Sequence, residues 1–220
     1  MELTCPQTGE ECLEAFFWRY PEMVVCENEV RAARELLCDV FEIGGKLMTC
    51  GNGGSAADSE HVVGELMKSF RFKRSVDDDF KAAYKVVNGC DVPAWLEGSL
   101  PAISLVSQTA LSTAFGNDES AVGVFAQQVY GYGRSGDALM AISTSGNSAN
   151  VVEAAKVARA KGVRVIALTG SEESQLSAIA DVCIRVPRDE VFQVQELHLP
   201  TYHVLCAAVE ADVFGEASGK

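Results

Sequence analysis

The sequence has 220 residues, 48% of them apolar and 22% charged, which is ordinary for a globular chain with a proper core. Its net charge of −13 disfavours nucleic acid and anionic membranes as partners, because such a field repels polyanions. No apolar run approaches the roughly 20 residues that span a bilayer, and the first residues lack a secretion-signal pattern, so we expect a cytoplasmic protein.

The first part of the chain predicts helices and one strand. Residues 11–22 form a short amphipathic pattern interrupted by a proline, and residues 24–45 carry apolar side chains at helical spacing. A buried strand is expected at 46–50, followed by a glycine loop and a helix over 55–70. Ser55 and Asp58 fit a capping box at the start of that helix. The N-terminal helices are apolar enough to need a partner, either their own domain or another subunit.

Residues 71–100 are polar and then mixed, without a clear period, and we expect an inserted excursion with one helix. After it, short apolar strands alternate with helices. Strands are predicted at 101–107, 137–143, 163–170 and 182–187, and helices at 118–133, 147–162, 171–181 and 191–214. This alternation indicates a parallel sheet covered on both faces. The prediction is one doubly wound α/β domain over 1–220, with an N-terminal helical extension at 10–45 and the excursion at about 71–100.

Two loops of this predicted sheet have a content that suits a phosphate group. Ligands bind open parallel sheets where strands lead into helix N-termini, which offer unpaired amides and a positive dipole end. One such loop is glycine-rich, at 51–55, and the glycines allow the backbone to approach a ligand closely. The other places four hydroxyls around Gly146 and Asn147: Ser143, Thr144, Ser145 and Ser148. Neither loop contains the lysine of a P-loop or the dinucleotide glycine spacing.

His61 and Glu65 are four residues apart, so they project from nearly the same face of the helix after the glycine loop. Such a pair is often only a modest helix contact. Two facts favour function: the pair follows the glycine loop directly, and the other two of the three histidines lie in the last predicted helix. That helix offers Gln195, Glu196, His198 and His203, and spacing does not choose among them. The groups suit either a zinc site or an acid/base couple.

Four segments together carry a resemblance to a known family: residues 51–66, 115–118, 142–162 and 194–210. They resemble the phosphoheptose isomerases of the SIS-domain sugar isomerases, over about 25–212 apart from 71–100. The resemblance implies a flavodoxin-like three-layer SIS fold and a homotetramer with active sites between subunits. It also implies interconversion of sedoheptulose 7-phosphate and D-glycero-D-manno-heptose 7-phosphate through an enediol, the first step of nucleotide-activated heptose biosynthesis for products such as lipopolysaccharide.

The resemblance also implies residue roles. Glu65 would be the base and His203 the acid. One zinc per subunit would bind His61, Glu65, Gln195 and His203, which leaves His198 as part of the structure. The phosphate would be held by Ser143, Thr144, Ser145 and Ser148. Other substrate contacts would come from Asn52, Gly53, Gly54, Ser55, Glu65, Asn117, Asp118 and Gln195.

The chain departs from the family pattern at three points. The segment between Phe70 and Pro101 is longer than usual. Ser69 stands where a basic residue is usual, so we expect either that Lys68, Arg71 or Lys73 supplies the charge or that the substrate differs. Pro200 lies inside the last helix, where it removes a backbone hydrogen bond and can kink the helix.

Two rival functions remain. One is a non-catalytic tetrameric SIS adaptor resembling the protein that binds the bacterial replication initiator, and the retained zinc set argues against it. The other is a phosphosugar-sensing module, which usually accompanies a DNA-binding or kinase-partner segment that is not visible in this sequence.

Overall fold

The computed structural model describes residues 8–215, and within them five parallel strands form one sheet in the order β2-β1-β3-β4-β5. The strands are β1 (Leu47–Cys50), β2 (Ala102–Ser104), β3 (Ala138–Ile142), β4 (Arg164–Thr169) and β5 (Val182–Arg185). From β1 the chain moves to β2 on one side, and from β3 it continues to the other side. The predicted doubly wound sheet is confirmed, and its order reverses between β1 and β3, where such folds bind ligands.

Both faces of the sheet are buried, which explains why the strands are apolar throughout. Successive side chains of a strand point to opposite faces. In β3, Ala138, Met140 and Ile142 therefore join one core cluster, while Leu139 and Ala141 join the other. The core consequently has two layers, one on each side of the sheet.

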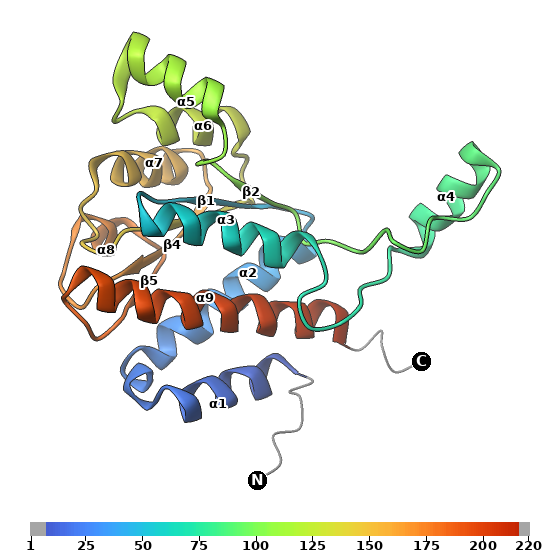
Figure 1. Ribbon diagram of the computed structural model, residues 1–220, viewed down its shortest axis with the longest axis horizontal. Helices are drawn as coiled ribbons and strands as arrows, with labels where there is room; N and C mark the ends of the chain where they lie inside the picture. The colour runs from blue at the N-terminus through green and yellow to red at the C-terminus, as the bar shows by residue number, and fades with distance from the viewer. Residues whose placement is uncertain (1–7, 216–220) are drawn as a thin grey trace.

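One face is covered by α1 (Gly9–Arg19), the 3-10 helix η1 (Pro21–Cys26), α2 (Glu27–Glu42), α3 (Gly54–Met67) and α9 (Val191–Phe214). Figure 1 shows α9 crossing this layer with α1 beneath it. Phe16 and Phe17 of α1 are buried in the same cluster as Val204 and Leu205 of α9. The N-terminal helices therefore pack on their own domain, the first of the two partners that the sequence left open.

The other face is covered by α6 (Val124–Tyr132), α7 (Ala149–Ala160) and α8 (Gln175–Ile179), with α5 (Thr109–Phe115) farthest from the sheet in Figure 1. The continuous helix predicted over 118–133 is wrong. A π-helical segment, η2 (Gly116–Ser120), precedes α6, and α5 was not predicted. The glycines at 116 and 123 stand at these junctions, where their low helix propensity favours a break.

The excursion contains one helix, as expected. It is α4 (Asp78–Asn88), which projects away from the sheet in Figure 1 and buries none of its residues. Among residues 8–215, no helix has both the length and the apolar character that crossing a bilayer requires.

Candidate active site

The two predicted phosphate loops lie side by side at the point where the strand order reverses. The glycine loop follows β1 and the serine loop follows β3, and these strands are parallel neighbours, so both loops leave the same edge of the sheet. Asn52 and Asn150 join them: each side-chain amide donates to the other's oxygen, at 2.8 and 2.9 Å. The fold thus assembles one polar edge from two segments that are about a hundred residues apart in the chain.

The serine loop is held in a defined shape at the start of α7. The hydroxyls of Ser143 and Ser148 are 2.9 Å apart, and the side-chain oxygen of Asn147 accepts a hydrogen bond from the backbone of Gln175 at 3.0 Å. Gly146 has φ +64, and a Cβ there would overlap the hydroxyl of Ser174. Thr144 is half-buried, while Ser145 is exposed. The loop therefore presents hydroxyls at a helix N-terminus, an arrangement that suits an anion.

The glycine loop begins α3 without the predicted capping box. The helix starts at Gly54 after Gly53, whose φ of +58 is the reason that a glycine is needed there, and no side chain caps it. Asn52 and Gly53 are exposed and Ser55 is buried. The proposed pairing of Ser55 with Asp58 is wrong, because the Asp58 carboxylate instead accepts a hydrogen bond from Tyr202 of α9.

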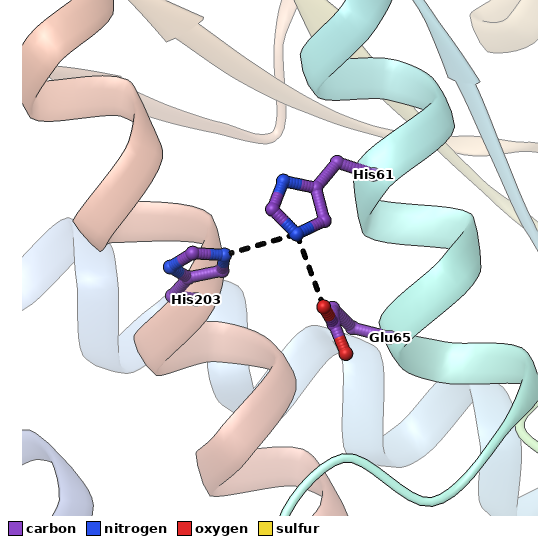
Figure 2. A group of neighbouring side chains, drawn as sticks. All are labelled: His61, Glu65 and His203. Atoms are coloured by element: carbon purple, nitrogen blue, oxygen red, sulfur yellow. Dashed lines mark hydrogen bonds and ion pairs between the residues drawn. The ribbon is translucent and has the colours of Figure 1, made fainter.

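Farther along α3, two imidazoles and a carboxylate converge. The Nε2 atom of His61 lies 3.0 Å from Oε1 of Glu65 and 3.4 Å from Nε2 of His203, which reaches across from α9 (Figure 2). One donor atom from each residue lies within 4.8 Å of those of the other two. We call these three residues the His–Glu–His group. The predicted pair on α3 and one of the candidates on α9 are thus brought together.

Two spacings in the His–Glu–His group, both measured from Nε2 of His61, fit zinc, while the ligand atoms of all three residues lie within 4.8 Å of one another. Tetrahedral ligands at the Zn–N and Zn–O distances of about 2.0–2.1 Å lie about 3.3 Å from one another, which is close to the 3.0 and 3.4 Å observed. Burial, and then the neighbouring His61, lower the pKa of His203, while Glu65 opposes the shift. A lowered pKa favours neutral imidazole, the form that binds a metal.

Gln195 lies elsewhere on α9. A Cβ built on Gly54 would stand 2.5 Å from its side-chain nitrogen, so its amide packs on the glycine loop. Eight residues separate it from His203, about 12 Å along a helix. In this chain Gln195 therefore lines the loop, while the His–Glu–His group is about two to three helical turns farther on.

The helix α9 runs through Pro200 without ending, from Val191 to Phe214. His198 is buried in the core, with Nε2 at 3.2 Å from the carbonyl oxygen of Thr169, away from the His–Glu–His group. The Glu196 side chain is exposed.

Asn117 and Asp118 lie outside this assembly. They are exposed on η2, and the Asn117 amide donates to the Asp118 carboxylate at 2.8 Å. Figure 1 shows the neighbouring α5 at the end of the molecule opposite to α9. The single chain thus does not bring these two predicted substrate residues to the His–Glu–His group.

Of the three candidate basic residues, Lys68 reaches the group: its Nζ is 3.5 Å from Oε2 of Glu65. Arg71 donates instead to the sulfur of Cys12 at 3.0 Å, and Lys73 is exposed.

A buried ion pair near the site was not anticipated from the sequence. Arg74 donates to the carboxylate of Glu210 at 2.7 Å, and both side chains are fully buried. Arg74 also donates to the backbone carbonyls of Glu65 and Leu66, in the last turn of α3. The only available signal was the placement of Glu210 in an otherwise apolar stretch of α9, which does not reveal its partner.

Comparison with known proteins identifies relatives of this chain. A family model described as SIS domain matches residues 80–170. The chain is 38% identical over 185 residues to a phosphoheptose isomerase of Rhodospirillum rubrum, covering 84% of this chain and 86% of the relative. It is 39% identical over 189 residues to one of Dechloromonas aromatica, covering 84% and 85%.

Solved structures match in the same way. The phosphoheptose isomerase structure from Neisseria gonorrhoeae aligns with a TM-score of 0.65 and 32% identity, over 90% of this chain and 97% of the other. The structure from Francisella tularensis aligns with a TM-score of 0.72 and 29% identity, over 89% and 93%.

Proposed function

The chain belongs to the phosphoheptose isomerase family, and from that premise we propose that it interconverts sedoheptulose 7-phosphate and D-glycero-D-manno-heptose 7-phosphate. The reaction is an aldose–ketose isomerisation, in which a proton moves between C1 and C2 through an enediol. It requires a base at carbon and an acid/base group near the two oxygens. In the cell this would be the first step of nucleotide-activated heptose synthesis.

The observation that supports the proposal best is the position of the His–Glu–His group relative to the phosphate loops. Gly54 starts α3 and His61 lies seven residues later, about 10 Å along the helix. An extended seven-carbon sugar phosphate spans a comparable length. A phosphate at the paired loops would therefore leave the first two carbons near the acid/base residues.

At the phosphate end, Ser143, Thr144, Ser145 and Ser148 would donate hydroxyl hydrogen bonds, together with the first amides of α7. The chain is strongly acidic, so it attracts a dianion only through such local donors. Asn52, Gly53, Gly54, Ser55 and Gln195 line the adjoining loop and would contact the sugar.

At the reacting end, Glu65 would act as the base. Its Oε1 faces His61 and its Oε2 faces Lys68 at 3.5 Å, so the two oxygens have different neighbours. The ammonium of Lys68 lies beside Oε2 of the carboxylate that would accept the proton from carbon. His203, whose lowered pKa favours a neutral ring, would move the proton between the substrate oxygens.

We assign zinc as the cofactor, one per subunit, on His61, Glu65 and His203, with Gln195 as the fourth ligand implied by the family resemblance. The 3.0 and 3.4 Å spacings support the first three residues. Gln195 would have to turn from Gly54 to join them. The chemistry that zinc supplies when bound is polarisation of a carbonyl oxygen.

We propose a cytoplasmic homotetramer with active sites between subunits. Asn117 and Asp118 support this arrangement, because within one chain they lie away from the His–Glu–His group although the resemblance places them at the substrate. A neighbouring subunit would supply them.

The adaptor and sensor functions are not favoured, because the family relatives are isomerases and the His–Glu–His group is assembled for chemistry. A coupled assay with sedoheptulose 7-phosphate separates the three, run on native, chelator-treated and zinc-restored enzyme. Turnover that is lost on chelation and restored by zinc is the expected result. Phosphosugar binding without turnover would indicate a sensor, and neither binding nor turnover an adaptor.

A further inference from the structure

The Nδ1 edge of His61 contacts a series of hydrogen-bonded side chains, Tyr202 and Asp58, that takes no part in the proposed isomerase chemistry. The Tyr202 hydroxyl lies 3.0 Å from Nδ1 of His61 and donates to Oδ1 of Asp58 at 3.2 Å. Tyr202 is fully buried in the core between α9 and α3. The imidazole of His61 therefore lies between two consecutive residues of α9, with Tyr202 at Nδ1 and His203 at Nε2.

The number of protons available to Asp58, Tyr202 and His61 favours one donor-to-acceptor direction for the hydrogen bonds that join them. A phenol has a single proton, and an ionised carboxylate only accepts. With Asp58 ionised, Tyr202 donates to it, and the Tyr202 oxygen accepts from the atom that faces it, Nδ1 of His61. In this arrangement Nδ1 carries a proton. In a neutral imidazole the lone pair is then on Nε2, the nitrogen that faces Glu65 and His203.

Without the Tyr202–Asp58 hydrogen bond, His61 would take the other neutral tautomer, with its proton on Nε2. Glu65 lies 3.0 Å from Nε2 and would accept an Nε2–H, which leaves that nitrogen without a lone pair. Metal-binding histidines commonly donate their other N–H to a neighbouring group, which sets the tautomer and orients the ring. Here a buried tyrosine is placed between the histidine and the carboxylate.

We propose that Tyr202, backed by Asp58, is a positioning residue that keeps the proton on Nδ1 of His61 and leaves Nε2 for a cation. The proposal rests on the proposed function in so far as the cation is zinc. The placement of the proton does not depend on which metal binds.

The test compares Tyr202→Phe with Thr201→Val. The first removes only the hydroxyl and keeps the ring that packs in the core. The second removes a buried hydroxyl from the preceding residue, which donates to Leu197 and not to the His–Glu–His group. Zinc affinity of the metal-depleted full chain is measured by competition with a chromophoric chelator. Nitrogen-15 NMR of labelled histidines reports which ring nitrogen of His61 carries a proton.

We expect Tyr202→Phe to bind zinc about 10- to 100-fold more weakly, and Thr201→Val to bind it as the native chain does. In the metal-free native chain, Nδ1 of His61 is protonated, and in Tyr202→Phe the proton moves to Nε2. Unchanged zinc affinity in Tyr202→Phe, or a bare Nδ1 in the native chain, would overturn the proposal. If the native chain binds no zinc, the cofactor assignment fails, while the Nδ1 proton still decides the role of Tyr202.

Discussion

The side chains of Asn52 and Asn150 exchange two hydrogen bonds and so join the loop after β1 to the helix after β3. Because these strands are neighbours at the point of strand reversal, the pair spans the edge of the sheet where a ligand is expected. The geometry of the proposed phosphate site consequently depends on a contact between two loops and not on either loop alone.

Replacement of Asn150 by alanine removes both of these hydrogen bonds. Two neutral hydrogen bonds contribute roughly 1–3 kcal/mol together, so we expect KM for the phosphosugar to rise by about tenfold while kcat changes little. Steady-state kinetics check the split. Asn28→Ala, at an exposed amide on α2, is the matched control. An unchanged KM in Asn150→Ala would show that the two loops hold the substrate independently.

Replacement of Glu65 by glutamine keeps the size of the side chain and removes the proposed base. General acid/base groups contribute about 10²–10⁴-fold, so turnover should fall at least 100-fold while the fold and phosphosugar binding are retained. Circular dichroism and calorimetric titration of the phosphosugar accompany the assay. Glu60→Gln, on the same helix but bonded to Ser107, should keep its activity. Substantial activity in Glu65→Gln removes this residue from the mechanism.

Replacement of Arg74 by methionine leaves the Glu210 carboxylate buried without its charged partner, while the backbone N–H groups of Phe70 and Arg71 still donate to it. Breaking such a pair from one side typically destabilises a fold by about 3–5 kcal/mol, and urea denaturation measures it. Turnover should also fall, because Arg74 holds the backbone carbonyl of Glu65. Lys156→Met breaks an exposed pair with Glu153 and should change stability by less than about 1 kcal/mol. Equal stability of the two variants would contradict the assignment.

His198 predicts a pH dependence of stability. Burial lowers its pKa from 6.5 to about 4, although the Thr169 carbonyl opposes the shift. Between these values the unfolded chain binds a proton that the folded chain does not, so stability falls as pH falls from about 6.5 to about 4. The full effect is roughly 3 kcal/mol. Urea midpoints of the native chain and His198→Gln over this range test it. His198→Gln should lack that part of the slope, and an identical slope in both proteins would disprove it.

Local patterns in the sequence were sufficient for most of the architecture. The apolar strands and the helices between them predicted the parallel sheet, and the closing helix was predicted with the bounds 191–214 that are observed. Each of these elements is buried on or within the sheet, and this burial requires apolar residues at a regular spacing that can be recognised in the sequence. The segment around Gly116 and Gly123 was misjudged, because a π-helical turn leaves no such period.

In the candidate site, too, some features could be predicted from local spacing and others could not. The spacing of His61 and Glu65 on one helix predicted their shared face, since helix geometry is local. The choice of His203 over His198 came from the resemblance to the isomerases, and packing confirms that His203 is the one beside His61.

Contacts between distant segments remained beyond the sequence. Asp58 was assigned to a capping box, yet its carboxylate accepts a hydrogen bond from the Tyr202 hydroxyl. Nothing near Arg74 indicated Glu210 as its partner, and nothing near Asn52 indicated Asn150. A side chain's choice among several possible partners depends on which helix packs against it, and that is decided only when the sheet brings the helices together. The spacing of apolar residues along the sequence was therefore sufficient to predict the fold class. The pairing of the two loops and the contact of Tyr202 with Asp58 are determined by how the helices pack on the sheet.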